Sequence, residues 1–436
     1  MRKNLCVGIL RETKNEERRA PLTPSDVKWL TGKGVEVEIE CSKARIFKDE
    51  QYRKNGAKIV EKFRKASLLV GIKEPRIEDL YENKIYMIFS HTCKGQSYNM
   101  PLLRALLERR ITLVDYERIV DAHNRRLVYF GRFAGICGMV DSLHYMGKRL
   151  QWEGIANPFT SIKPAFTYRS LKEVREAMAI LDRRIQTRGF DRRIAPFIIG
   201  VTGHGNVSRG AQEILGTLAP IEIHPRDMLR FIRRQRRYRN RIYKIVFLRE
   251  EKYRLRNGGG FYFEDYLNHP ERFESNLDKY LQYLNMFIHT SYWDGRYPRL
   301  VTKQMIHKLA RRKLFRLSFI GDLSCDINGS VEITYKTATF CNPVYTYNPK
   351  RRVYADGYRS KGITILAIDN LPSELPKDAS VEFGSLIREY VYQIAAHGIK
   401  DITRHAALPA EIRRSVITEE GRLTEDFSYL KKYIRR

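Results

Sequence analysis

The sequence predicts an α/β protein with two domains, each built around a parallel, twisted β-sheet. Apolar runs of strand length alternate with helical segments, which is typical of strand–helix–strand units. Polar residues follow several of these runs directly, and a glycine-rich turn joins a strand to a helix near the middle of the chain. A length of 436 residues also exceeds that of one typical hydrophobic core, so we expect two domains.

The first domain is expected to alternate strands and helices. A helix should begin at Pro24, with Thr23 as its N-cap, and end at Gly32 and Gly34. Apolar or alternating runs predict strands at Leu5–Leu10, Val35–Ile39, Ser67–Ile72, Ile85–Ser90 and Ile111–Val114. The segment after Pro372 is expected to be helical and to return to this domain.

Polar side chains follow three successive strands of this domain. Lys73, His91 and Glu117 each come just after a different apolar run. Crevices in open α/β sheets form beyond the carboxyl ends of the strands, so these side chains are expected to converge on one cleft. Lysine and histidine in such a cleft can transfer protons near neutral pH.

A second α/β unit begins near Arg192. The buried-strand pattern Ala195–Val201 leads into Gly203 and Gly205 and then into a helix that continues through Leu215. Glycines at such a turn let the backbone approach a pyrophosphate at the helix N-terminus, although Ser208 stands where a third glycine is usual. Further strands are expected at Met286–Thr290, Phe319–Leu323 and Ile363–Ile368. The pattern predicts a Rossmann-like, dinucleotide-binding domain.

The choice of dinucleotide depends on the strand after this helix. An acidic residue about 20 positions beyond the glycines commonly binds the adenosine ribose. Here Ile221–Pro225 places His224 near that position, with Arg226 close behind. A cation without a carboxylate suits a 2′-phosphate, so NADP(H) is favoured and NAD(H) is possible. Glu222 could serve instead if the register differs by two residues.

Composition limits the class of protein. The longest apolar runs are far short of a membrane span, no signal-peptide pattern is present, and the six cysteines form no CxxC pair, so we expect a cytoplasmic protein without a metal site. The formal charge of +30 has its densest source in Arg226–Lys244, which we interpret as a solvated helix face. Nucleic-acid binding stays open, but the sequence contains no recognisable module for it.

The chain resembles the lysine–2-oxoglutarate reductase (lysine-forming saccharopine dehydrogenase) family, as found in the reductase half of bifunctional aminoadipate semialdehyde synthases. A fainter similarity extends to the single-function fungal saccharopine dehydrogenases. The resemblance extends in family order from residue 1 to beyond 430. Its motifs are Arg11–Pro24, Phe89–Gln96, Phe130–Gly135, Thr202–Ala211, His269–Phe273, Tyr297–Leu300, Asp322–Asp326 and Ile368–Pro372.

The resemblance implies an NAD(P)-dependent oxidoreductase that condenses L-lysine with 2-oxoglutarate and reduces the imine to saccharopine. It implies a substrate domain of residues 1–138 with 371–436, a dinucleotide-binding domain of residues 139–370, and an active-site cleft between them. Because the chain ends where the reductase half would end, a separate glutamate-forming saccharopine dehydrogenase is expected as a possible partner.

The resemblance also assigns roles to individual residues. Lys73 and His91 match the acid–base pair. Substrate-binding roles fall on Arg19, Glu74, Lys94, Gln96, Glu117 and Arg126. From the glycine turn and the ends of the following strands, cofactor-binding roles are expected for Gly203, Gly205, Asn206, Val207, Ser208, His224, Arg226, Ser291, Tyr292 and Asp369.

Two alternatives stay open. One is an enzyme like alanine dehydrogenase or transhydrogenase, which shares the two-domain plan but would not explain the His91–Gln96 loop. The other is a non-catalytic protein that binds a cofactor or nucleic acid and uses the positive charge.

Overall fold

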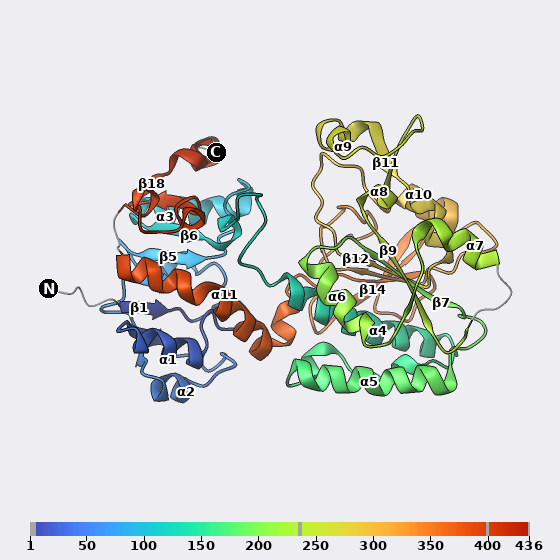
Figure 1. Ribbon diagram of the computed structural model, residues 1–436, viewed down its shortest axis with the longest axis horizontal. Coiled ribbons are helices and arrows are strands. Elements are labelled where there is room, and N and C mark those ends of the chain that lie inside the picture. The colour runs from blue at the N-terminus through green and yellow to red at the C-terminus, as the bar shows by residue number, and fades with distance from the viewer. Residues whose placement is uncertain (1–5, 234–237, 398–400, 435–436) are drawn as a thin grey trace. The chain divides into compact units, whose positions relative to one another are not determined.

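The chain folds into two α/β units, seen in the computed structural model of Figure 1. The structure describes residues 6–233, 238–397 and 401–434. The first unit comprises Met1–Phe130 and Pro376–Arg436, and the second comprises Gly131–Leu375. The expected boundaries at 138/139 and 370/371 fall inside helix α4 (Gly131–Trp152) and at the short helix η10 (Leu371–Glu374). The chain therefore changes unit at the ends of these helices rather than within them.

The first unit is built on an eight-stranded sheet in the order β18-β17-β6-β5-β4-β1-β2-β3. The six strands of the N-terminal segment are parallel, and β17 and β18 add an antiparallel edge. The strands are β1 (Cys6–Ile9), β2 (Glu36–Glu40), β3 (Lys58–Val60), β4 (Leu68–Val70), β5 (Ile85–Ile88), β6 (Thr112–Asp115), β17 (Val416–Glu419) and β18 (Arg422–Leu423).

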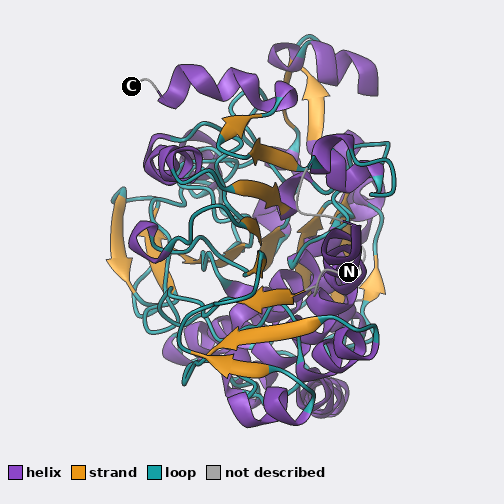
Figure 2. Ribbon diagram, turned by 90° about the vertical axis from the view of Figure 1, so that its left-hand side faces the viewer, coloured by secondary structure: helices purple, strands orange, loops and turns teal. Residues whose placement is uncertain are grey.

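Helices cover both faces of this sheet (Figure 2). On one face, alternate strand residues such as Val7 and Ile9 pack against α1 (Pro24–Gly32), α2 (Asp49–Lys54) and α11 (Pro376–His397). On the other face, residues such as Leu69 and Ile88 pack against α3 (Met100–Glu108) and the C-terminal segment that ends in α13 (Lys431–Ile434). Burial on both faces explains why these strands are continuous apolar runs in the sequence.

The second unit has its own eight-stranded sheet, in the order β15-β14-β16-β13-β12-β7-β9-β8. Six of its strands are parallel, and β14 and β15 form an antiparallel hairpin at one edge. The strands are β7 (Phe197–Thr202), β8 (Ile221–Glu222), β9 (Ile242–Phe247), β12 (Met286–His289), β13 (Phe319–Asp322), β14 (Val344–Asn348), β15 (Val353–Asp356) and β16 (Ile363–Leu366).

The other elements of this unit lie around the sheet. A small antiparallel pair, β10 (Tyr253–Leu255) and β11 (Phe273–Ser275), stands apart from it. The helices are α4, α5 (Leu171–Arg188), α6 (Asn206–Gly216), α7 (Met228–Arg233), α8 (Arg249–Lys252), α9 (Phe263–Asn268) and α10 (Lys303–Leu309).

The α/β class and the expected parallel core strands are confirmed, with three differences. Both sheets are mixed rather than wholly parallel, because hairpins close one edge of each. Strand β9 was missed, since its apolar residues directly follow a basic run. The segment after Pro372 returns to the first unit as α11, but it also supplies β17 and β18, so its expected purely helical character is wrong.

The basic run Arg226–Lys244 is not one helix. Its described part contains the six-residue helix α7 and the start of β9, while Arg234, Arg236 and Arg237 lie outside the described residues. The interpretation as a single solvated helix face is therefore wrong. Among the helices that the structure describes, none has the length and apolar character needed to cross a bilayer.

Candidate active site

Lys73, His91 and Glu117 lie at the carboxyl edge of the first sheet. Strands β4, β5 and β6 run parallel in register, with Val70 beside Met87 and Met87 beside Val114. The pairing continues past the strands, because the Phe89 amide donates to the Ile72 carbonyl at 3.0 Å. The residues that follow each strand therefore emerge at one edge, as the sequence predicts.

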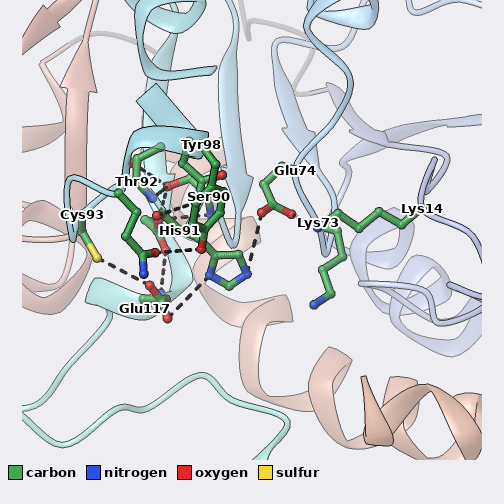
Figure 3. Close-up of polar contacts among 12 residues, drawn as sticks. Lys14, Lys73, Glu74, Ser90, His91, Thr92, Cys93, Tyr98 and Glu117 are labelled. Carbon is green, nitrogen blue, oxygen red and sulfur yellow. Dashed lines mark hydrogen bonds and ion pairs between the residues drawn. The ribbon is translucent and has the colours of Figure 1, made fainter. Parts of the chain in front are cut away.

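The His91 ring lies between two carboxylates (Figure 3). Its Nε2 is 4.0 Å from Oε1 of Glu74, and its Nδ1 is 3.8 Å from Oε1 of Glu117. The backbone at His91 is left-handed (φ 52°), and the His91 carbonyl accepts a 2.9 Å hydrogen bond from the Asn99 side-chain amide. The ring also stacks on Phe89, with centroids 6.1 Å apart. These contacts fix the direction in which the imidazole points.

Glu117 is a buried carboxylate that stays charged. Burial alone would raise its pKa, but the interaction with His91 and the charges of Arg126, His91 and Lys94 lower the pKa to about 2. Arg126 donates to its Oε1 at 2.9 Å, and the Cys93 thiol approaches its Oε2 at 3.5 Å. The site therefore contains a permanent negative charge beside an imidazole.

Lys73 presents an amine whose proton affinity is reduced. Burial, and then the charge of Arg19, lowers its pKa below the ordinary lysine value. No ion pair or hydrogen bond of its ammonium is found within the described part of the chain, and Figure 3 shows Glu74 between Lys73 and the His91 ring. The neighbouring carboxylate of Glu74 is instead paired with Lys14 at 2.7 Å. A half-buried lysine with a lowered pKa gives up its proton more readily than an exposed lysine, which suits it to proton transfer.

Arg19 is placed differently from the expectation. Its guanidinium donates to both carboxylate oxygens of Glu17, at 2.7 and 2.5 Å, and covers the Phe130 ring at 4.1 Å. Only 2% of the Arg19 side chain is exposed. Its fork is therefore already occupied by a carboxylate of the same chain. Its described influence on the site is electrostatic, through the lowered pKa of Lys73.

The other expected substrate contacts lie around the cluster. Arg126 is 47% exposed and holds Glu117 with one nitrogen. Lys94 is exposed in the loop after His91 and acts on Glu117 through its charge. Gln96 is exposed in the same loop, and its side-chain oxygen accepts a 2.8 Å hydrogen bond from the Tyr98 hydroxyl.

Two acidic residues of this edge were missed by sequence reasoning. Glu12 accepts hydrogen bonds from the Ile72 and Lys73 amides at 2.6 and 3.0 Å, and burial followed by the charge of Glu17 raises its pKa to about 7. Burial and the charge of Glu117 raise the pKa of Asp115 to about 6. Asp115 ends β6, so its position at a strand end was a usable signal. Nothing local marks Glu12, because its partners are 60 and 61 residues away.

The glycine turn of the second unit has the geometry expected of a phosphate cradle. Gly203 is left-handed (φ +75°), and a Cβ there would lie 2.9 Å from the Ser291 hydroxyl. Helix α6 begins at Asn206 with Gly205 as its N-cap, and a Cβ on Gly205 would meet nothing within 4 Å. The first amides of α6, including those of Asn206 and Val207, therefore lack helical partners, and the space over Gly205 is open. This arrangement fits a pyrophosphate.

Ser208 does not disrupt the turn. It is buried, and its hydroxyl donates to the Gly203 carbonyl at 2.7 Å, which closes the turn from inside. Close packing of the helix is provided two residues later by Gly210, where a Cβ would lie 1.9 Å from the Arg132 carbonyl of α4. The glycine needed for close packing is therefore shifted along α6 rather than lost.

A pocket of about 340 Å³ adjoins this turn. Its lining residues are His204, Gln212, Glu222, Ile223, His224, Pro225, Val246, Leu248 and Glu251. Because β9, not β8, pairs with β7, the strand end beside the glycine turn is that of β9. Glu251 follows that end, with its Oε1 3.7 Å from His224 Nε2, while Arg226 is 78% exposed and outside the lining. Two carboxylates, those of Glu222 and Glu251, therefore line the pocket next to the turn together with His224.

The remaining cofactor residues also follow parallel strands of this sheet. Ser291 follows β12 and accepts a 2.8 Å hydrogen bond from the Lys252 ammonium. Tyr292 is 71% exposed, and Asp369 is exposed after β16. Burial, followed by the charges of Asp322 and Asp369, raises the pKa of the Cys325 thiol. Lys252 itself was not predicted from the sequence.

Two models of known protein domains match most of the chain. The model of the alanine dehydrogenase/PNT N-terminal domain matches residues 8–137, and that of the C-terminal domain matches residues 250–426.

The chain has the two-domain alanine dehydrogenase/PNT architecture.

The resemblance to alpha-aminoadipic semialdehyde synthases and to lysine-forming saccharopine dehydrogenases is confirmed. The chain is 33% identical to alpha-aminoadipic semialdehyde synthase of Arabidopsis thaliana, over 98% of the chain and 41% of that protein. It is 32% identical to the mitochondrial alpha-aminoadipic semialdehyde synthase of Mus musculus, over 98% of the chain and 47% of that protein. The chain thus spans less than half the length of these relatives. The saccharopine dehydrogenase [NAD(+), L-lysine-forming] of Emericella nidulans is 23% identical, over 89% of the chain and 92% of that protein.

Solved structures support the fold. An L-alanine dehydrogenase superposes with a TM-score of 0.62 at 18% identity, covering 99% of both chains. A transhydrogenase from Sinorhizobium meliloti gives a TM-score of 0.57 at 13% identity, covering 96% of this chain and 100% of the other.

Proposed function

We propose that this chain is an oxidoreductase that condenses L-lysine with 2-oxoglutarate and reduces the resulting imine to saccharopine. The observation that carries the proposal is that Lys73 and His91 lie together at the carboxyl edge of the first sheet, with His91 between Glu74 and Glu117. Its support from known proteins is the similarity to alpha-aminoadipic semialdehyde synthases over 98% of the chain.

The reaction requires proton transfers at two atoms. The ε-ammonium of lysine must lose a proton before its nitrogen attacks the keto carbon of 2-oxoglutarate, and the resulting hydroxyl must gain a proton to leave as water. Lys73, with its lowered pKa, is suited to accept the first proton. His91, oriented by the carboxylates on either side, is suited to donate the second.

The carboxylates of the substrates need fixed cations. Arg126 and Lys94 are exposed and act on Glu117 through their charges. Arg126 holds that carboxylate with one nitrogen, so its other guanidinium nitrogens can bind a substrate carboxylate. Arg19 is proposed to support the site by its charge, because Glu17 already occupies its guanidinium.

A nicotinamide dinucleotide fits the second unit. The amides at the start of α6, the open space over Gly205 and the hydroxyl of Ser291 would hold it. When bound, it supplies the hydride that reduces the imine carbon. We propose NAD(H) as the preferred form, because Glu222 and Glu251 line the pocket next to the turn and would repel a 2′-phosphate. The cytoplasmic location and a separate glutamate-forming partner enzyme stay predictions.

The test is a set of initial rates. The absorbance of NADH near 340 nm (roughly the band lost on hydride transfer) is followed with lysine and 2-oxoglutarate together, with each alone, and with pyruvate and ammonia. We expect oxidation when lysine and 2-oxoglutarate are both present and background rates otherwise. Oxidation with pyruvate and ammonia but not with lysine would reject the proposal in favour of an alanine dehydrogenase-like activity.

A further inference from the structure

Lys252 is a buried cation at the edge of the glycine turn. It ends α8, which directly follows β9, and only 6% of the residue is exposed. Its ammonium donates to the Ser291 hydroxyl at 2.8 Å. That hydroxyl lies 2.9 Å from the position that a Cβ of Gly203 would occupy. The ammonium is therefore one side chain away from the turn that fits a pyrophosphate.

No carboxylate neutralises this ammonium within the described ranges. Glu251, the nearest acid in sequence, accepts from the Leu248 amide at 2.8 Å. Glu250 is exposed and acts on Lys252 only through its charge, which raises the pKa of Lys252 and is outweighed by burial and by the charge of Arg249. Arg249 is a second cation of the same helix, stacked on the Phe263 ring at 4.6 Å. Lysine is almost never fully buried unless it is paired, because an unpaired charge loses its hydration. The Lys252 ammonium therefore has no carboxylate as a direct partner among the described residues.

The groups around Lys252 confirm that its surroundings favour the neutral amine. Burial, followed by the charge of Arg249, lowers the pKa of Lys252 to about 8. His289, which ends β12, is fully buried, and burial followed by the charge of Lys252 lowers its pKa to about 3. The His289 ring is therefore neutral, and its Nε2 has no hydrogen-bond partner among the residues described. Tyr253 faces the ammonium from β10 with its ring centroid 5.8 Å away.

We propose that Lys252 is a cofactor-binding residue whose ammonium is the counter-charge to the pyrophosphate of the dinucleotide at the Gly203 turn. This inference rests on the proposed function, because it takes the turn to be a dinucleotide site. Binding of the pyrophosphate supplies the missing anion and the remaining hydrogen-bond acceptors. The bound complex therefore holds Lys252 fully protonated, and binding takes up a proton near the pH at which the free amine titrates.

The test is isothermal titration calorimetry of the full chain with NADH at pH 8, in buffers with different ionisation enthalpies. With a free pKa of about 8, the wild type should take up about half a proton per dinucleotide. ADP should give the same uptake, and adenosine, which has no pyrophosphate, should give none. The variants below separate the contribution of Lys252 from that of other groups near the turn, such as His204.

Substitutions separate the role of Lys252 from that of other groups. Lys252→Met should weaken NADH binding by about 10- to 100-fold, as expected for loss of a hydrogen bond to a charged group, and should abolish the proton uptake. Lys252→Arg keeps a permanent charge, so it should bind NADH better than Lys252→Met and take up no proton. Lys313→Met, an exposed lysine of the same unit, should behave as the wild type. Thermal unfolding of each variant checks that it is folded.

The outcomes distinguish this inference from the proposed function. Proton uptake that persists in a folded Lys252→Met protein, or no uptake by the wild type on binding NADH, overturns the role of Lys252 and leaves the function intact. Binding with the predicted uptake, in a protein that shows no lysine-dependent activity, supports Lys252 and rejects the reaction. A wild type that binds neither NADH nor ADP overturns both.

Discussion

The Glu117 carboxylate lies 3.8 Å from Nδ1 of His91, and its pKa of about 2 keeps it charged at every pH at which the protein would work. A neutral replacement would keep the shape of the side chain but remove the charge that orients the ring. Glu117→Gln is therefore expected to lower kcat by about 10- to 100-fold, in the range found for partners that orient a functional histidine. Steady-state rates check this, and an unchanged kcat would show that Phe89 stacking alone positions His91.

The same carboxylate predicts a pH dependence of stability. The pKa of Glu117 is depressed in the folded protein, so its contribution is fully present above about pH 4.5 and is lost as the pH falls towards 2. Near neutral pH, the free energy of unfolding of the wild type should exceed that of Glu117→Gln by up to about 3 kcal/mol. This difference should become smaller on acidification. Urea unfolding at pH 7, 4 and 3 measures the difference in the free energy of unfolding between the two proteins. A difference that does not change with pH would contradict the depressed pKa.

Lys73 is predicted to act in catalysis and not in cofactor binding. Lys73→Met should reduce kcat by about 100- to 10,000-fold, the range expected for loss of a general acid or base. The Kd for NADH should be unchanged, because the glycine turn belongs to the other unit. Lys28→Met, an exposed lysine on α1, is the matched control. If Lys73→Met lost as much NADH affinity as turnover, the assignment of Lys73 to catalysis alone would be contradicted.

Alanine substitution at two glycines of α6 is predicted to have different effects on the free energy of unfolding. A Cβ on Gly210 would lie 1.9 Å from the Arg132 carbonyl, so Gly210→Ala must push α4 and α6 apart at a cost of about 3 kcal/mol. A Cβ on Gly216 would meet nothing within 4 Å, so Gly216→Ala should leave the free energy of unfolding unchanged or slightly raised. Urea unfolding compares the two. Equal stabilities would mean that the helices are not in this close contact.

Glu251 is predicted to select between the two dinucleotides. Glu251→Gln removes the charge but keeps an oxygen that can accept from the Leu248 amide. We expect the ratio of kcat/KM for NADH to that for NADPH to fall by about 10-fold or more, as repulsion of the 2′-phosphate disappears. Glu250→Gln, an exposed neighbour, should leave the ratio unchanged. A wild type that already prefers NADPH would refute the assignment.

The residues at the strand ends could be predicted because their signal is local. An apolar run that stops at Lys73, His91 or Glu117 marks both the strand and its carboxyl end, and parallel pairing brings the ends together. The glycine turn was equally visible, since Gly203 is followed directly by a helix.

Features that depend on which strands become neighbours could not be predicted. Counting along the chain from the glycines reaches His224, but β9 takes the place beside β7, so Glu251 stands next to the turn instead. The position of β9 beside β7 also places Lys252 against Ser291, which is 39 residues away in the sequence. The pairing of Arg19 with Glu17 was also hidden, because the sequence does not show whether a side chain turns inwards or towards a ligand.

The most direct test of the central claim is to identify the product by mass spectrometry. The purified chain is incubated with lysine labelled with ¹⁵N at the ε-amino group, 2-oxoglutarate, and NADH deuterated at the transferred position. We predict one product that contains both carbon skeletons joined through the labelled nitrogen, with deuterium at the former keto carbon. Absence of this joined product, or appearance of deuterium in an amino acid formed from free ammonia, would contradict the assignment of Lys73 and His91 to this reaction.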